Sequence, residues 1–294
     1  MHCRPLAPPM NTLVSLSELA ARIPDGARLA IAQDSVGVSM AATRELVRRG
    51  ARGLRLVCVP LSGMQADILI GAGCVAAIET SAVTLGEYGG AARFAAALRA
   101  RGIELRDATC PAIHAALQAG EKNIPFMPLR GLIGSDLLAH RPDWKVVDNP
   151  FSTGDGAGGE PIVLLPAIRP DVALVHAPLA DREGNVWIGR RRDALTMAHA
   201  SLRTLATVEA VRDTSLFDDP ALAAGTVPAI YVDAIALAPN GAWPIGLPDT
   251  TAPDPAALQA YATAAKDEAG FAAWLADWLA RDWPAAGLNT ADAR

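Results

Sequence analysis

The sequence predicts an α/β fold, doubly wound around a mainly parallel sheet with helices on both faces. Two observations lead to this class. Short apolar runs rich in Val, Ile and Leu alternate with segments of helical periodicity, and strands that alternate with helices build βαβ units and parallel sheets. Hydrophobic residues make up 51% of the 294 residues, so a core large enough for one such body is available.

The first half of the chain, up to Gly120, alternates helix and strand regularly. Ser15 and Glu18 match an S-x-x-E capping box, and Ser39 is placed to cap a helix that Gly50 ends. The predicted helices are 15–23, 39–50, 66–72, 91–101 and 110–119, and the predicted strands are 28–33, 54–59, 75–79 and 103–105.

The second half, from Asp143, is less regular. Residues 149–159 hold four glycines and are predicted to form a mobile loop. Gly184 and Asn185 tolerate positive φ, which favours a tight reversal into the next strand. After a short apolar pair at 146–147, the predicted strands are 162–165, 172–175, 186–188, 204–208 and 230–237, and the predicted helices are 193–200, 253–265 and 269–280.

The whole pattern is typical of one α/β body over residues 12–283. We expect a flexible leader at 1–11 and a frayed tail at 284–294. Phe271, Trp274, Leu275 and Trp278 recur at helical spacing in the final helix. This stripe predicts a core or subunit contact rather than a cofactor site.

Composition excludes several classes of protein. No apolar run approaches the roughly 18 residues of a membrane-spanning helix, and the first residues lack the apolar stretch of a signal peptide. The four cysteines form no C-x-x-C, which suits free thiols in a reducing compartment and argues against structural zinc. A formal net charge of −5 disfavours nucleic acid. We therefore expect a cytoplasmic protein without membrane or nucleic-acid partners.

Open parallel sheets bind ligands beyond the carboxyl ends of their strands. Applied to the predicted strands, this rule selects the loops 33–39, 80–90 and 126–138 as candidate ligand-binding segments. We expect all three to lie at one edge of the sheet.

Four stretches carry a resemblance to a known family. The longest runs from Pro161 to Asn185 and reads PIVLLPAIRPDVALVHAPLADREGN. The others are 127–137, MPLRGLIGSDL, then 207–209, TVE, and finally 232–234, VDA, with the Pro, Gly, Ala and Pro residues that follow it at 239–244. Together they resemble the A subunit of the family I CoA-transferases, the group of glutaconate CoA-transferase. The resemblance covers about residues 24 to 280 and implies the same α/β fold.

The resemblance implies a CoA thioester as substrate, no permanently bound cofactor, and a nucleophilic glutamate on a partner B subunit. That carboxylate attacks the acyl-CoA carbonyl, and a glutamyl-CoA thioester then passes CoA to an acceptor acid. No glutamate of this chain lies in a convincing nucleophile motif, and Glu87 is the nearest candidate for a catalytic residue. The implied partners are therefore a B-type subunit, an acyl-CoA and a small carboxylic acid.

The candidate substrate-binding residues lie in the three selected loops. The resemblance places a serine that binds the distal carboxylate of the substrate at Ser81, and Thr84 follows it. Arg130 could pair bidentately with a carboxylate or could tie its own loop. The remaining candidates are Gly131 and Ser135 in the third loop and Ser35 and Gly37 in the first.

Three other groups of charged or titratable residues are expected to have no direct role in binding or catalysis. His176 ends a predicted buried strand and is expected to be a core histidine with satisfied hydrogen bonds. His114 and His140 have no partner spacing for a metal. Arg190, Arg191 and Arg192 are expected to form a solvated or interface charge run.

The sequence departs from the family after the first strand, where a Gly-rich G-G-F-G is usual. Here residues 32–37 read AQDSVG, and only Gly37 is kept. Glycine permits close approach of a ligand to the backbone, and Asp34 would repel a nearby phosphate or carboxylate. Two alternatives stay open: a subunit of the same fold in an acyl-CoA ring-opening hydrolase or an acyl-CoA decarboxylase, and a non-catalytic acyl-CoA-binding protein. The neighbouring reading frame separates the hypotheses. A B-type subunit with the nucleophilic glutamate supports CoA transfer, a B-type subunit without it supports the hydrolase or decarboxylase, and no such frame supports the binding protein.

Overall fold

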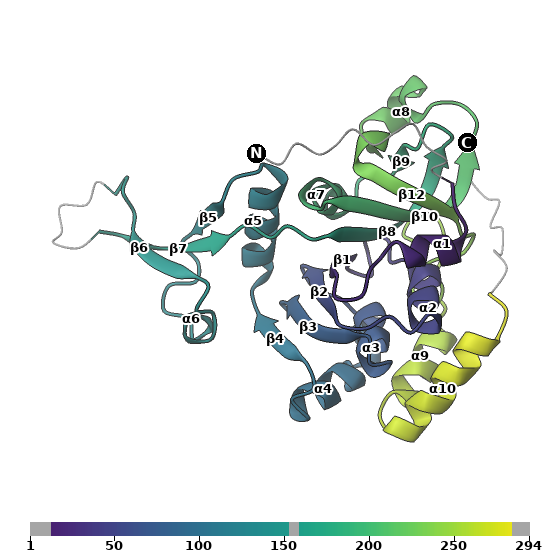
Figure 1. The fold of residues 1–294 in the computed structure, drawn as a ribbon, viewed down its shortest axis with the longest axis horizontal. Coiled ribbons are helices and arrows are strands. Elements are labelled where there is room, and N and C mark those ends of the chain that lie inside the picture. Colours follow the sequence, from purple (N-terminus) through teal and green to yellow (C-terminus); the bar gives the residue numbers. More distant parts are fainter. Residues whose placement is uncertain (1–12, 153–158, 284–294) are drawn as a thin grey trace.

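A nine-stranded, mostly parallel sheet forms the centre of the molecule (Figure 1). The computed structural model describes residues 13–152 and 159–283. The strands are β1 (Arg28–Ala32), β2 (Leu54–Val59), β3 (Val75–Thr80), β4 (Glu104–Asp107), β8 (Val172–Asp181), β9 (Val186–Trp187), β10 (Arg203–Arg212), β11 (Thr226–Val227) and β12 (Val232–Leu237). The long row runs β12-β10-β8-β1-β2-β3-β4, with β9 and β11 antiparallel beside the end of β8. The fold class is as predicted, and residues 28–33 and 75–79 share one sheet.

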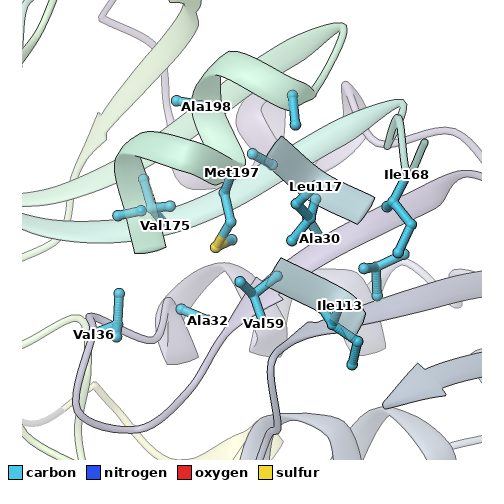
Figure 2. Close-up of a cluster of buried hydrophobic side chains, with 14 of the residues drawn as sticks. Ala30, Ala32, Val36, Val59, Ile113, Leu117, Ile168, Val175, Met197 and Ala198 are labelled. Carbon is cyan, nitrogen blue, oxygen red and sulfur yellow. The ribbon is translucent and has the colours of Figure 1, made fainter. Parts of the chain in front are cut away.

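Helices cover both faces of this sheet because successive strand residues point to opposite sides. In β1, Leu29 and Ile31 pack with one hydrophobic cluster, and Ala30 and Ala32 pack with the other. The first cluster contains side chains of α1 (Leu16–Ala21), α2 (Met40–Arg48) and α3 (Met64–Gly71), with α4 (Ala92–Arg99) packed against it. The second contains α5 (Cys110–Glu121) and α7 (Arg192–Ala200), whose side chains meet those of the strands in Figure 2.

A second, three-stranded antiparallel sheet extends from the main body, at the left of Figure 1. It consists of β5 (Phe126–Leu129), β6 (Lys145–Asp148) and the central β7 (Pro161–Pro166), with the short α6 (Leu137–His140) between β5 and β6. The prediction that 126–138 is one loop at the edge of the parallel sheet is therefore wrong. Pro128 disguised the strand, because proline cannot donate to a ladder and is tolerated only where a strand has a free edge.

Buried ion pairs join the small sheet to the main one. Arg141, which precedes β6, donates to the Glu79 carboxylate on β3 at 2.7 Å, to Asp143 at 3.0 Å and to the Asp107 carbonyl at 2.9 Å. Its guanidinium lies 4.1 Å from the centroid of the Trp144 ring. Arg28 also donates to Glu79, at 2.8 Å. A small cavity of about 150 Å³ lies beside this network, against α5.

Two local predictions need correction and one is confirmed. The capping box of Ser15 and Glu18 is present at α1. Ser39 is the N-cap of α2, but its side chain makes no capping bond, because its hydroxyl contacts Thr207 at 2.6 Å instead. The strand predicted from residue 230 begins at Val232, because Ala229–Tyr231 forms a 3₁₀ turn that leaves Ile230 exposed.

The chain finishes with two packed helices, α9 (Pro255–Ala264) and α10 (Glu268–Ala280). Phe271 and Trp278 are buried, and Trp274 packs on Tyr261 with ring centroids 4.7 Å apart. The aromatic stripe is thus core, as predicted. Within the described residues, no helix is both long and apolar enough to cross a membrane. The predicted leader 1–11, the tail 284–294 and part of the predicted loop 149–159 lie outside the described residues.

Candidate functional site

The segments that follow β1, β2 and β3 lie together at the carboxyl edge of the parallel sheet. Asp34 follows β1, Gly63 follows β2 and Ser81 follows β3. The Ser81 amide donates to the Pro60 carbonyl at 3.1 Å, so the loops after β2 and β3 are tied to each other. α5 begins at Cys110 just beyond β4, which brings its first residue to the same edge. These residues form the candidate site.

Ser81 is half-buried, and its hydroxyl is already engaged. Its Oγ donates to the Pro60 carbonyl at 2.8 Å, and the Cys110 thiol donates to Ser81 Oγ at 3.2 Å. A serine hydroxyl has one donor, so in this state it offers no free donor to a ligand. A carboxylate is a stronger hydrogen-bond acceptor than a neutral carbonyl. The Ser81 hydroxyl can therefore exchange the Pro60 carbonyl for the carboxylate of a bound acid.

Thr84 and Glu87 occupy the remainder of the loop after β3. Thr84 Oγ1 accepts from the Gly86 amide at 3.2 Å, so this side chain supports its own turn. Glu87 lies in the 3₁₀ turn Gly86–Tyr88 and is exposed. Nothing in this setting distinguishes Glu87 from a solvated loop acid.

Asp34 is the least satisfied polar group of the site. Its Oδ1 is shielded from solvent and has no hydrogen-bond partner among the described residues. A Cβ atom placed on Gly63 would lie 2.4 Å from Asp34 Oδ2 and 2.9 Å from the Thr84 carbonyl oxygen, so only glycine fits there. Burial raises the pKa of Asp34 to about 6. A carboxyl group in this state can accept a hydrogen bond from a ligand or hold a proton near neutral pH.

Ser35 and Gly37 continue the loop after β1 and have different environments. Ser35 is exposed, whereas Gly37 is buried with φ of 118°. A Cβ on Gly37 would lie 2.1 Å from the His176 carbonyl oxygen, and the His176 amide donates to the Gly37 carbonyl at 2.9 Å. The glycine kept from the family pattern is therefore required by packing against β8.

His176 is a core histidine with satisfied hydrogen bonds, as predicted. Nε2 lies 2.7 Å from Glu209 Oε1, and Nδ1 lies 2.8 Å from Thr207 Oγ1. Because a carboxylate only accepts, Nε2 donates to Glu209, and Nδ1 and Thr207 Oγ1 share a second hydrogen bond. Thr207 Oγ1 also shares a hydrogen bond of 2.6 Å with Ser39 Oγ. These hydrogen bonds link His176 on β8 to Thr207 and Glu209 on β10 and to Ser39 at the start of α2.

Arg130, Gly131 and Ser135 lie on the small antiparallel sheet and its α6 connection, not beyond a strand of the parallel sheet. The Arg130 guanidinium is 70% exposed and pairs with Glu160 at 2.9 Å, rather than with Asp136. Gly131 is exposed, and Ser135 Oγ accepts from the Leu137 amide at 3.2 Å. The structure thus brings Ser81, Thr84 and Asp34 together and leaves these three residues on a separate element.

Cys110 is the site residue that the sequence analysis missed. The rule that ligands bind beyond the carboxyl ends of strands also covers the segment after the fourth strand, which the three selected loops leave out. The contact between Cys110 and Ser81 depends on how α5 leaves β4, and no sequence spacing reports it. Within residues 13–152 and 159–283, no group of three His, Cys, Asp or Glu side chains could hold a metal ion.

The chain is similar in sequence to known subunits of CoA-transferases. The family described as Coenzyme A transferase matches residues 13–238. The A subunit of 3-oxoadipate CoA-transferase from Pseudomonas knackmussii is 29% identical over 284 residues, which is 92% of this chain and 94% of the relative. The A subunit of glutaconate CoA-transferase from Acidaminococcus fermentans is 30% identical over 81% of this chain and 78% of its own.

Two solved structures have the same fold. Glutaconate CoA-transferase from Acidaminococcus fermentans superposes with a TM-score of 0.83 at 26% identity, covering 92% of this chain and 89% of the other. A variant of the decarboxylase AibA/AibB gives a TM-score of 0.78 at 30% identity, covering 92% of this chain and all of the other. The extent of these matches makes the assignment: this chain belongs to the CoA-transferase family, as an enzyme component of the type of the family I A subunits.

Proposed function

We propose that this chain is the A subunit of a heteromeric enzyme that moves CoA between an acyl-CoA and a small carboxylic acid. A partner B subunit supplies the nucleophilic glutamate. The observation that carries the proposal is the pairing of full-length similarity to A subunits with an edge that offers hydroxyl and thiol groups but no positioned glutamate among the described residues. Glu209 is engaged by His176 and the Asn240 amide, and Glu87 is exposed.

In this reaction the partner's carboxylate attacks the thioester carbonyl, the C–S bond breaks, and CoA leaves as a thiolate with a mixed anhydride remaining. The thiolate attacks the glutamyl carbonyl and releases the first acid, which leaves a glutamyl-CoA thioester. The acceptor acid then repeats these two steps in reverse. The chain described above contributes positioning. Ser81 holds a carboxylate or carbonyl oxygen of the acyl group, and Gly63 lets the loop after β2 pack closely against Asp34 and the Thr84 carbonyl.

The test is an assay of the purified chain with acyl-CoA and a free acid, alone and mixed with a B-type subunit. We expect no transfer by the chain alone and transfer by the mixture. Transfer that persists in the chain after rigorous removal of every second polypeptide would contradict the proposal, because the nucleophile would then lie on this chain.

A second candidate is decarboxylation of an acyl-CoA by a complex of the same fold. The motive is the departure from the family pattern after β1, where the shielded Asp34 stands in place of the usual glycines. The similarity to the decarboxylase AibA/AibB supports the same interpretation. Measuring CO₂ release from carboxylated acyl-CoA substrates beside CoA transfer to an added acid separates the two reactions.

A further inference from the structure

An arginine-rich hollow opens beside the loop that follows β1. Its volume is about 370 Å³, and its lining includes Ser35, Arg190, Arg191, Arg192, Asp193 and Asp249. We call it the arginine hollow. Asp34 is not part of its lining, because that carboxylate faces Gly63. The sequence predicted only a solvated or interface charge run here, whereas the fold gathers the three arginines around one concave surface.

The arginine hollow lies where the order of the strands reverses. From β1 the chain proceeds to β2, β3 and β4 on one side, and it returns later to place β8 and β10 on the other. Open α/β sheets leave a crevice at such a switch point, outside the carboxyl ends of the strands. Ser35 follows β1, and α7 packs over β1 and β8 with its first residue in the hollow.

Two of the arginines are available to a ligand. Arg192 is exposed, and its side chain has no hydrogen bond or ion pair among the described residues. Arg190 is 93% exposed and faces Asp249, itself 75% exposed, across 3.7 Å, which is a loose pair. Arg191 is held in place by the carbonyls of Ile188 and Pro248, and its shielded Nε has no partner within the described part of the chain.

The acidic groups of the hollow are partly occupied by other residues. Asp193 Oδ2 accepts from the Gln33 amide at 3.1 Å, and Oδ1 lies 3.8 Å from His114 Nδ1. Three arginines against these two acids leave an excess of positive charge. The N-terminus of α7 adds to it, because Arg191 is its N-cap and provides no side-chain cap for the free amides.

We propose that the arginine hollow binds the phosphate groups at the nucleotide end of the CoA thioester. This inference rests on the proposed function, which places the acyl end at Ser81 on the same edge of the sheet. CoA carries its negative charge on the adenosine 3′-phosphate and the diphosphate, and guanidinium forks bind phosphate oxygens bidentately. An open, exposed hollow suits the solvated end of a long ligand better than it suits the reacting thioester.

The direct test measures binding of adenosine 3′,5′-bisphosphate to the full chain by calorimetry. The Arg190→Gln/Arg192→Gln double variant should bind about tenfold more weakly, because two charge-assisted contacts are lost. The matched control is Arg203→Gln, an exposed arginine at the start of β10 on the opposite edge, which should bind like the wild type. All variants should melt like the wild type, since these side chains are exposed.

The kinetic test uses the assembled enzyme with two thioesters of the same acid. In the double variant, KM for the CoA thioester should rise about tenfold, whereas KM for the N-acetylcysteamine thioester, which has no nucleotide, should not change. Unchanged bisphosphate binding, an equal rise for both thioesters, or displacement by a simple carboxylate but not by phosphate would overturn the inference. Arginine-dependent bisphosphate binding without turnover of any thioester would instead refute the proposed function alone.

Discussion

Single residues at the carboxyl edge differ in how completely their polar atoms are satisfied. Ser81 has two partners, whereas Asp34 Oδ1 has none among the described residues. The raised pKa of Asp34 makes this a pH-dependent cost. Below about pH 4 the carboxyl group is protonated in both folded and unfolded chains, and above about pH 6 it is charged in both, with the folded state bearing the loss of solvation.

Asp34→Asn should therefore stabilise the chain at neutral pH and have little effect near pH 4. The contribution of Asp34 to the free energy of unfolding falls as pH rises from about 4 to about 6, and the gain from the variant grows over the same interval. A rise in pKa from 3.8 to about 6 sets its upper limit at about 3 kcal/mol. Urea unfolding of both proteins across this pH range checks it, and a constant difference would contradict the raised pKa.

Ser81→Ala should lower kcat/KM of the assembled enzyme roughly ten- to a hundredfold. A hydrogen bond to a charged group contributes about 1.5–3 kcal/mol, and about 1.4 kcal/mol is a factor of ten in rate. Thr84→Val should have a smaller effect, because Thr84 Oγ1 supports its own turn. Steady-state kinetics decide. Full activity of Ser81→Ala together with a lower Tm would mean that its bond to Pro60 is purely structural.

At the scale of elements, the small antiparallel sheet depends on Arg141 for its attachment. This guanidinium is 4% exposed, and the Glu79 side chain that it meets is 5% exposed. Arg141→Met would keep some of the packing on Trp144 but leave buried carboxylate oxygens short of partners. Such losses cost about 3–5 kcal/mol. Thermal unfolding should show a Tm lower by several degrees.

Arg130→Met is the matched control for this variant. It removes an arginine–glutamate pair from the same small sheet, but at a side chain that is 70% exposed. Exposed pairs contribute about 0–1 kcal/mol, so its Tm should stay near that of the wild type. Equal shifts for both variants would show that burial of the Arg141 network has no special weight.

Across the whole molecule, the sequence predicted the strands and helices, which depend on hydrophobic periodicity. It could not predict contacts between loops that are far apart in the sequence. The alternation of apolar runs indicated the parallel sheet and placed Ser81 beyond its third strand. Because Pro128 argues against a strand, the sequence did not predict β5. Arg130 was therefore expected at the edge of the parallel sheet, whereas it follows β5 of the small antiparallel sheet. The burial of Asp34 requires Gly63 to come close from another loop, and that distance is set by how β1 and β2 pair.

The contact of Cys110 with Ser81 also gives the chain a chemical reporter of its own occupancy. Of the three cysteines that the structure describes, Cys58 and Cys74 are buried, and burial raises their pKa to about 12 and about 11, whereas Cys110 is exposed. Alkylating reagents react with thiolates, so in a Cys3→Ser background iodoacetamide should label Cys110 selectively. An acyl group held at Ser81 would cover a sulfur only 3.2 Å from that hydroxyl. Labelling of the assembled enzyme should slow when acyl-CoA is added, and an unaltered rate at saturating substrate would mean that the acyl group binds elsewhere.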